Sequence, residues 1–265
     1  MAAKKHKSTV LITGASGGIG MELAEVFARN GHNLVLVARS EDKLYRLAMR
    51  YATNYKVYAK VIAADLSDPA APQRLFDELK QANMVVDVLV NNAGVGNYGP
   101  FRETNLQKEL DMLQLNVVAL THLSKLFLYQ LPAGTPGKIL NVSSVAAFLS
   151  GPYMAIYYAS KAYVLSFSEA IKGELEKHNV TVTTLCPGPT DTDFKERANL
   201  DSSSRFSAMF KEDAREVAEA GYTGLMKGEN IVLPGLKNKA LPHLLKLVPR
   251  SILRNMVLKI QESRQ

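Results

Sequence analysis

Tyr157 and Lys161 are the residues whose types and spacing most directly suggest chemistry. They lie four positions apart in a stretch of helical character, and residues at that spacing share one helix face. A free tyrosine has a pKa of about 10 and exchanges protons poorly at neutral pH. A neighbouring ammonium group favours the phenolate and lowers that pKa. The pair predicts acid–base chemistry. Because this spacing arises by chance about once in a chain of this length, the residues around the pair must decide whether it is catalytic.

Two other polar positions support this interpretation. Ser143 and Ser144 follow the apolar run Ile139–Val142, and a serine there could hydrogen-bond a substrate carbonyl. The alternative is ordinary turn chemistry at the end of a strand. Asn116 stands among apolar neighbours, where a buried amide is costly unless it is used. We therefore treat Ser143 or Ser144, together with Asn116, as candidate site residues.

A glycine-rich segment follows the first apolar run of the chain. It reads Gly14-Ala15-Ser16-Gly17-Gly18-Ile19-Gly20. A bound pyrophosphate needs backbone N–H groups at a helix N-terminus and no side chains in the way. We expect Gly14 to permit a tight turn, Gly18 to let the backbone approach phosphate, and Gly20 to let helix pack on strand. Ser16 adds a hydroxyl donor. A flexible turn is the alternative, but four glycines in this short segment disfavour it.

The end of the second apolar run indicates which dinucleotide binds. NAD sites usually place an acidic residue there, whereas an arginine accommodates the 2′-phosphate of NADP. The run Leu34–Val37 leads into Ala38-Arg39-Ser40, with no carboxylate at the expected position. The guanidinium of Arg39 suits phosphate, while Ser40 and the acidic residues after it resemble a helix N-cap. The sequence predicts NADP(H) rather than NAD(H).

Two more segments are candidates for the nucleotide site. Asn91-Asn92-Ala93-Gly94 ends the fourth apolar run, and its small and amide residues could shape the floor under adenosine. Asp65, after the third run, could face the adenine amino group. Plain turn chemistry is the alternative for both segments.

Short apolar runs alternate with helical stretches along most of the chain, which predicts a single α/β domain of the doubly wound Rossmann type. We expect a central parallel sheet of about seven strands flanked by helices. The expected strands are Val10–Thr13, Leu34–Val37, Val57–Ile62, Val86–Val90, Ile139–Val142, Val180–Leu185 and Ile231–Leu233. The expected helices are Ile19–Asn30, Glu41–Thr53, Ala70–Ala82, Leu106–Leu131, Tyr157–His178 and Asp213–Lys227.

Composition adds few constraints. The 265 residues are 47% hydrophobic and 22% charged, as in ordinary globular proteins. The single cysteine, Cys186, excludes an internal disulfide and fits a reducing compartment. The basic start of the chain is followed by an apolar run too short for a signal peptide or membrane span. We expect a cytoplasmic protein and no metal site.

The net charge of +7 is concentrated after residue 234. This segment carries seven Lys and Arg residues against Glu262, so it supplies six of the excess charges. We therefore expect a dinucleotide-binding and catalytic part over residues 1–234 and a basic amphipathic extension of it over residues 235–265. The body is nearly neutral, so nucleic-acid binding is not favoured. One helix face in the extension would carry Ile252, Leu253, Met256, Val257 and Ile260. It could form a lid or subunit contact, rest weakly on a membrane surface, or pack into the core.

Together these motifs resemble the short-chain dehydrogenase/reductase family over about Thr9 to Leu233. Its glycine, amide and catalytic motifs are matched by Thr13, Gly14, Gly18, Gly20, Asn91–Gly94, Tyr157 and Lys161. The resemblance selects Ser144, thirteen residues before the tyrosine, as catalytic serine and Asn116 as the fourth catalytic residue. It also implies that Pro187, Gly188 and Thr192 hold the nicotinamide carboxamide.

The resemblance implies reduction of a carbonyl by NADPH, or the reverse oxidation of an alcohol. Tyr157 would protonate the forming alkoxide while Ser144 holds the carbonyl oxygen. Lys161 would bind the nicotinamide ribose and, with the nicotinamide cation, lower the Tyr157 pKa. Asn116 would hold a water that links Lys161 to solvent. A homodimer or homotetramer is expected. The alternative is an NADPH-binding sensor with little turnover.

The substrate is predicted only as a class. Candidate pocket residues are Tyr98, Phe148, Leu149, Tyr153, Met154, Phe194, Phe206, Met209 and Phe210. They are mostly apolar, which indicates a small-molecule hydrophobic carbonyl or alcohol. The alternative is that several of them belong to the core.

Overall fold

The polypeptide alternates strands and helices from residue 9 onward. The structure, a computed structural model, describes residues 7–132, 134–190, 192, 194, 198, 212–235 and 248–262. The strands are β1 (Thr9–Thr13), β2 (Asn33–Ala38), β3 (Ala59–Ala63), β4 (Val88–Asn91), β5 (Gly137–Val142), β6 (Val180–Leu185) and β7 (Ile231–Val232).

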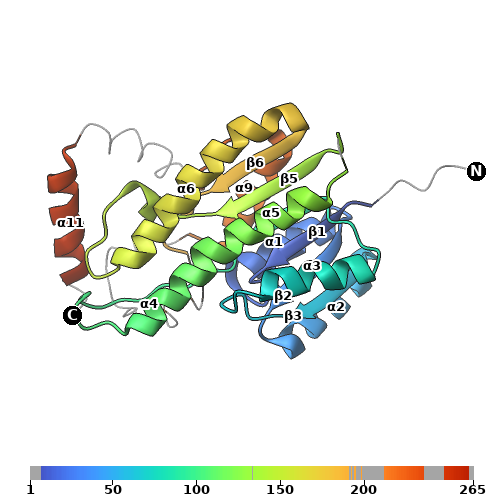
Figure 1. Ribbon diagram of the computed structural model, residues 1–265, viewed down its shortest axis with the longest axis horizontal. Helices are drawn as coiled ribbons and strands as arrows, with labels where there is room; N and C mark the ends of the chain where they lie inside the picture. Colours follow the sequence, from blue (N-terminus) through green and yellow to red (C-terminus); the bar gives the residue numbers. More distant parts are fainter. Residues whose placement is uncertain are drawn as a thin grey trace, which may run out of the picture.

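All seven strands form one parallel sheet in the order β3-β2-β1-β4-β5-β6-β7 (Figure 1). The connections run outward in one direction from β1 and in the other from β4. The strand order therefore reverses between β1 and β4, which is where open α/β sheets bind ligands. This arrangement confirms the predicted doubly wound Rossmann-type fold.

Helices cover both faces of the sheet (Figure 1). The α-helices are α1 (Gly18–Arg29), α2 (Glu41–Tyr55), α3 (Ala71–Gln81), α4 (Leu106–Leu113), α5 (Leu120–Gln130), α6 (Ala155–Leu175), α9 (Ala214–Lys227) and α11 (Arg250–Glu262). Strand β1 shows why two layers form. Its side chains alternate, so Val10 and Ile12 enter one core with α1, α2 and α9, whereas Leu11 enters the other with α3 and α5.

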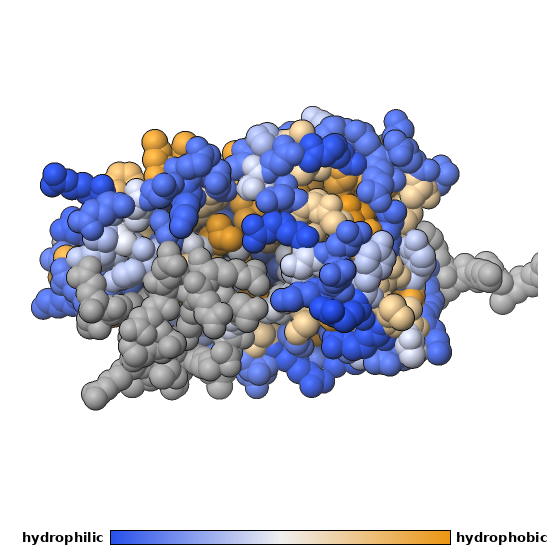
Figure 2. Space-filling view, turned by 90° about the horizontal axis from the view of Figure 1, so that it is seen from below, coloured by the Kyte–Doolittle hydropathy of each residue, from blue (hydrophilic) through white to orange (hydrophobic). Residues whose placement is uncertain are grey.

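The core leaves mainly polar surface outside. Figure 2 shows a largely hydrophilic face on which apolar atoms surface only in small patches. No helix in the described ranges is both long and apolar enough to cross a membrane.

The predicted helix over residues 106–131 is wrong as a single continuous α-helix. Residues Gln114–Ala119 form a π-helical turn, η1, between α4 and α5. A π turn inserts one extra residue per turn and redirects the side chains at that point. Asn116 lies in this turn. Its side-chain amide hydrogen-bonds to the backbone of Val95, in the segment after β4, instead of facing solvent.

Several other predicted boundaries shift by one to three residues. β3 and β4 each begin two residues later than predicted, and α6 begins two residues earlier, at Ala155. The prediction for β6, Val180–Leu185, matches the structure at both ends. Short 3₁₀ turns at Val145–Phe148 (η2) and Glu176–His178 (η3) were not predicted as separate elements.

Buried amides link the two central strands behind the site. The Asn91 side chain on β4 donates to Asn141 Oδ1 on β5 at 2.9 Å, and Asn141 donates to Ser168 Oγ on α6 at 2.8 Å. Asn91 also donates to Ser124 Oγ on α5 at 3.1 Å. These bonds fix the strand ends against the helices that carry the site residues.

Candidate active site

A large cavity opens along the carboxyl edge of the sheet. Its volume is about 1030 Å³, and it runs from the end of β2 to helix α11. Of the predicted site residues, only Gly20 and Asn116 do not line it. The predicted residues that do line it are Gly14, Ser16, Gly18, Ile19, Arg39, Asp65, Asn92, Ala93, Gly94, Ser144, Tyr157, Lys161, Pro187, Gly188 and Thr192.

The glycine loop adopts a backbone that side chains would prevent. Gly14 and Gly18 have φ angles of +66° and +53°, in the left-handed region that favours glycine. A Cβ atom at Gly20 would lie 2.3 Å from the Gly14 carbonyl oxygen and 2.4 Å from Asn92 Nδ2. Gly20 therefore permits contact with the loop and β4, in addition to the predicted packing of helix on strand.

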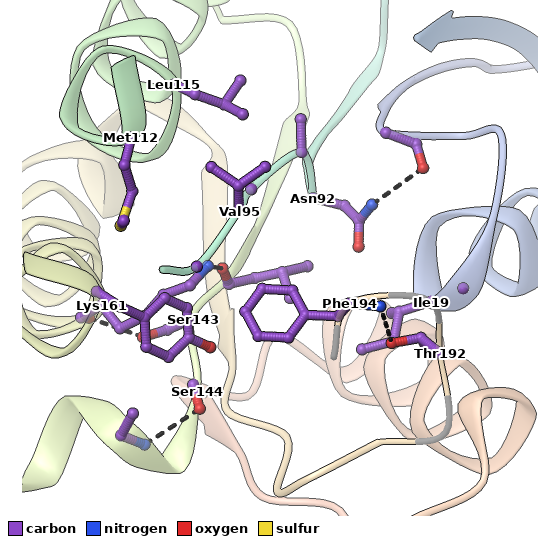
Figure 3. Close-up of a pocket in the computed structure, with 18 of the residues that line it drawn as sticks. Ile19, Asn92, Val95, Met112, Leu115, Ser143, Ser144, Lys161, Thr192 and Phe194 are labelled. Carbon is purple, nitrogen blue, oxygen red and sulfur yellow. Dashed lines mark hydrogen bonds between the residues drawn. The ribbon is translucent and has the colours of Figure 1, made fainter. Parts of the chain in front are cut away.

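The amide motif after β4 braces the glycine loop. Asn92 Nδ2 donates to the Thr13 carbonyl at 2.9 Å, so the side chain points toward β1 (Figure 3). The Thr13 hydroxyl accepts from the backbone N–H groups of Asn92 and Ala93 at 2.9 and 3.0 Å. We predicted these residues as a floor under adenosine. The observed bonds give Asn92 a positioning role in the loop itself.

Asn116 and Lys161 flank Gly94. Asn116 is 2% exposed; its Oδ1 accepts from the Val95 N–H at 3.0 Å, and its Nδ2 donates to the Val95 carbonyl and to Ser160 Oγ. A Cβ atom at Gly94 would lie 3.2 Å from Asn116 Oδ1 and 3.4 Å from Lys161 Nζ. The prediction that this buried amide must be used is confirmed, and the partners are protein groups.

The Tyr157 phenol and the Lys161 amine are both buried at the cavity wall. Lys161 Nζ donates to the Val142 carbonyl at 2.9 Å and lies 5.9 Å from the centre of the Tyr157 ring. Burial lowers the pKa of Lys161 to about 8, because the charged ammonium loses its hydration.

Burial raises the pKa of Tyr157 to about 12, although a hydrogen bond from Ser144 opposes the rise. These causes come from the protein's own groups alone, so the predicted lowering by Lys161 together with a nicotinamide cation stays a prediction. In these surroundings the phenol carries its proton at neutral pH.

The two serines after β5 have different partners. Ser143 Oγ donates to the Lys161 carbonyl at 2.8 Å and so holds helix α6 against the sheet. Ser144 Oγ accepts from the Ala146 N–H at 3.1 Å (Figure 3) and donates to the Pro187 carbonyl at 3.4 Å. It also lies close enough to the Tyr157 phenol to oppose the rise in its pKa. Ser144 is thus the serine beside the phenol.

The segment after β6 covers the middle of the cavity. The Pro187 carbonyl accepts from the Val145 N–H, and the Gly188 N–H donates to Glu212 Oε2, both within 2.9 Å. Thr192 lies over Gly18, where a Cβ atom would come within 2.9 Å of its methyl group. The Phe194 ring projects into the cavity, with its centre 5.4 Å from that of Tyr157 (Figure 3).

Arg39 and Asp65 form the outer, polar end of the cavity. Their charged groups lie 4.0 Å apart, and the Arg39 side chain is 66% exposed. Burial raises the pKa of Asp65, but hydrogen bonds from Ser67 and the charge of Arg39 outweigh it and lower that pKa overall. Asp65 Oδ1 accepts from the backbone N–H and hydroxyl of Ser67, so its turn role is realised. Its predicted contact with adenine remains a prediction.

The inner end is apolar but differs in part from the prediction. Leu149, Met154 and Phe194 line it as expected, whereas the Tyr98 and Tyr153 rings stack on each other with centres 5.7 Å apart. Phe148 is not among the lining residues. Phe206, Met209 and Phe210 lie outside the described residues. The lining residues that we did not assign to the pocket include Met112, Leu115, Leu253, Met256, Val257 and Ile260.

The last four of these belong to α11, whose apolar face the sequence did predict. That face turns toward the cavity, although Ile252 and Met256 remain 51% and 55% exposed. The location of α11 favours the lid interpretation among the three we considered.

A doubly wound sheet with a glycine loop at β1 and a buried tyrosine and lysine beside the strand ends defines a nicotinamide-nucleotide oxidoreductase. A family model of short chain dehydrogenases matches residues 8–203. The chain belongs to this short-chain dehydrogenase/reductase family, whose members act on CH–OH or C=O groups.

Similar proteins agree with this assignment. The chain is 32% identical over 246 residues to 7beta-hydroxysteroid dehydrogenase of Mediterraneibacter gnavus, covering 91% of this chain and 90% of that protein. A short-chain dehydrogenase from Sphingobium yanoikuyae in complex with NADPH superimposes with a TM-score of 0.81 at 33% identity, covering 92% of this chain and 94% of that one. A bulky-bulky ketone specific alcohol dehydrogenase from Comamonas testosteroni gives 0.75 at 31% identity, with coverages of 92% and 96%.

Another similar structure contains NAD instead of NADPH. A short chain dehydrogenase/reductase from Burkholderia phymatum in complex with NAD has a TM-score of 0.80 at 25% identity, covering 92% of this chain and 94% of that one. The comparisons therefore establish nicotinamide-nucleotide binding for the family but leave the choice between NAD and NADP to the residues of this chain.

The crowding at Gly20 leads to a testable prediction. Gly20→Ala places a methyl group against the Gly14 carbonyl and displaces the loop, so nucleotide affinity falls about tenfold or more, equivalent to at least about 1.4 kcal/mol. Gly173→Ala is the control, because a Cβ atom there meets nothing within 4 Å. Fluorescence titration with NADPH measures both; equal affinities would contradict the role of Gly20.

Proposed function

We propose that this protein reduces a bulky, largely apolar ketone or aldehyde with NADPH. The observation that carries the proposal is the position of the buried Tyr157 phenol. It lies beside Ser144 in one cavity that joins the glycine loop to an apolar chamber. The relatives whose names mention hydroxysteroids and bulky ketones support a substrate of this kind. The apolar lining of the chamber, from Met112 to Ile260, supports it independently.

The residues at the outer end fit a dinucleotide. The cradle formed by Gly14 and Gly18 would hold the pyrophosphate, and Ser16 would donate to it. Arg39 lies at the end of the main cavity and also lines a shallow pocket beside it, with Ser40, Glu41, Asp42, Lys43 and Arg46. Its guanidinium would bind the 2′-phosphate of NADP.

Further residues would complete the cofactor site. We assign Ile19 and Ala93 to its walls and Asp65 to the adenine amino group. Pro187, Gly188 and Thr192 would border the nicotinamide carboxamide, as in the family. The bound dinucleotide supplies the hydride that reduces the carbonyl carbon.

The protein's own groups supply the proton and the positioning. Tyr157 carries its proton at neutral pH and donates it to the forming alkoxide. Ser144 donates a hydrogen bond to the carbonyl oxygen and orients it toward the phenol. Lys161 binds the nicotinamide ribose, and its charge offsets the negative charge left on Tyr157. Asn116, held by Val95, would position a water between Lys161 and solvent.

Two alternatives receive less support. An NADPH sensor with little turnover is not favoured, because Tyr157, Lys161 and Ser144 are all present and the similar proteins named above are dehydrogenases. Weak contact of α11 with a membrane surface would need apolar residues that partly line the cavity instead. We assign the protein to the cytoplasm, in agreement with its free, buried Cys186; cell fractionation tests this assignment.

Removal of the Tyr157 hydroxyl tests the function. Tyr157→Phe should lower kcat for ketone reduction by roughly 10²- to 10⁴-fold, the usual contribution of a general acid, while NADPH still binds. NADPH consumption against a carbonyl panel measures it. Tyr129→Phe, at a side chain that is 77% exposed, should leave kcat unchanged. Wild-type turnover in the Tyr157 variant would refute the assignment.

Arg39 tests the choice of cofactor. A charged hydrogen bond to phosphate contributes about 1.5–3 kcal/mol, so Arg39→Ala should raise the KM for NADPH by roughly 10- to 100-fold. The KM for NADH should change little, because NADH lacks the 2′-phosphate. Arg102→Ala, an exposed residue outside the cavity, is the control. Equal effects on the two cofactors would show that Arg39 does not read this phosphate.

A symmetric dimer or tetramer is the assembly that we propose. Leu110, Val118 and Tyr163 are 47%, 47% and 39% exposed, and α4, α5 and α6 lie side by side on one face of the sheet (Figure 1). A hydrogen bond of 3.0 Å between Thr121 on α5 and Tyr163 on α6 joins two of these helices, and a symmetric contact would use the face that they share.

A charge in this surface tests the assembly. Val118→Glu should convert the wild-type oligomer to a monomer in sedimentation velocity, because a buried carboxylate at the contact would be unpaired. Met49→Glu, at an exposed residue of α2, should not change the sedimentation coefficient. A wild-type protein that sediments as a monomer at micromolar concentration would contradict the proposal.

A further inference from the structure

Helix α11 is fixed to the body by its last turn. The Tyr98 hydroxyl donates to the Gln261 carbonyl at 2.6 Å, which satisfies one of the carbonyls that have no partner within the helix. The Tyr98 ring is stacked on Tyr153, whose backbone has a φ of +64°. The Tyr153 carbonyl in turn accepts from the Gly99 N–H at 2.9 Å. These contacts hold Gln261 in one place.

The side chain of Gln261 is a buried amide that lines the cavity. The residue is 2% exposed, and its Oε1 atom has no hydrogen-bond partner among the described residues. A buried acceptor without a partner destabilises the free protein. An apolar residue would fill this position at lower cost, so the amide needs an explanation.

The surroundings leave few protein groups that could serve it. The other α11 residues on the cavity wall are all apolar: Leu253, Met256, Val257 and Ile260. Asn97, a polar residue of the same cavity, has its amide directed to Glu109 Oε1 at 3.3 Å. Among the described residues, no hydrogen bond joins Gln261 to Tyr157, Ser144 or Lys161. The cavity therefore carries a polar group separate from the catalytic ones.

We propose that Gln261 is a specificity-determining residue that accepts a hydrogen bond from the substrate. The inference rests on the proposed function, and it narrows the substrate class. The substrate is a largely apolar ketone that also carries a hydroxyl or N–H group. Its carbonyl lies at Tyr157 and Ser144, and its donor lies at Gln261. Such a substrate supplies the missing hydrogen bond, so the cost of burying the Gln261 amide, which is present in the free protein, is offset only in the complex.

Binding to matched ketones tests the proposal. One probe is a cyclohexanone with a para-hydroxyphenyl group opposite its carbonyl; the others carry plain phenyl or para-methoxyphenyl. A longer pair is dihydrotestosterone and its counterpart without the hydroxyl group. Calorimetry on the complex with NADP⁺ gives Kd without turnover for the aryl ketones, which carry no alcohol that NADP⁺ could oxidise, and NADPH consumption gives KM and kcat for all the probes.

For wild type we expect the hydroxyl-bearing member of at least one pair to bind about three- to tenfold more tightly, as for one neutral hydrogen bond. The methoxy ketone, which cannot donate, should bind like the phenyl ketone. Gln261→Leu should abolish the preference, and the loss should be seen in Kd and KM for the hydroxyl-bearing ketones. Without ligand, the Gln261→Leu variant should unfold at a temperature at least as high as that of the wild type, because the substitution removes a buried amide that has no partner.

Tyr98→Phe is the matched control, because it loosens α11 without changing the Gln261 side chain. It should weaken both members of each pair equally. No preference in wild type, or the same preference in Gln261→Leu, would overturn the inference. Failure of the proposed function is separate: no ketone would be turned over, while the calorimetric comparison would still decide the role of Gln261.

Discussion

The close approach of the glycine loop to the end of β4 is the constraint on which the rest of the site depends. Only a glycine at position 20 leaves room for the Gly14 carbonyl and the Asn92 amide. The Thr13 hydroxyl completes the junction by accepting two backbone N–H groups. Because β1 and β4 are neighbours at the reversal of strand order, this junction fixes the nucleotide end relative to the strands that carry the catalytic residues.

The local patterns in the sequence were sufficient for the fold and for much of the cavity. Continuous apolar runs marked the parallel strands, and β6 was bounded correctly because Asn179 and Cys186-Pro187 interrupt the run on either side. The positive φ angles of Gly14 and Gly18 follow from a turn that only glycine makes readily. Arg39 was placed at the cavity by its position at the end of β2.

What the sequence could not provide depends on burial and on distant contacts. The π turn at Asn116 forms because the amide bonds to Val95, twenty-one positions away, and helical periodicity carries no trace of that bond. The sequence drew attention to the charge of Lys161 near Tyr157, but it could not show that burial raises the pKa of Tyr157 and lowers that of Lys161 in the protein's own surroundings. Tyr98 was assigned to the pocket on hydrophobicity, yet it stacks on Tyr153 and holds α11.

The bond between Tyr98 and Gln261 spans 163 positions of sequence, whereas the loop and β4 meet within 80. The chain emerges from the ribosome with its N-terminus first. The glycine loop and the Thr13–Asn92 junction that holds it are therefore exposed before α11. The nascent protein can thus fold around a nucleotide while its substrate chamber still lacks a wall. A translational arrest or proteolytic cut before α11 would leave the glycine loop and its brace but remove the cavity wall that this helix supplies.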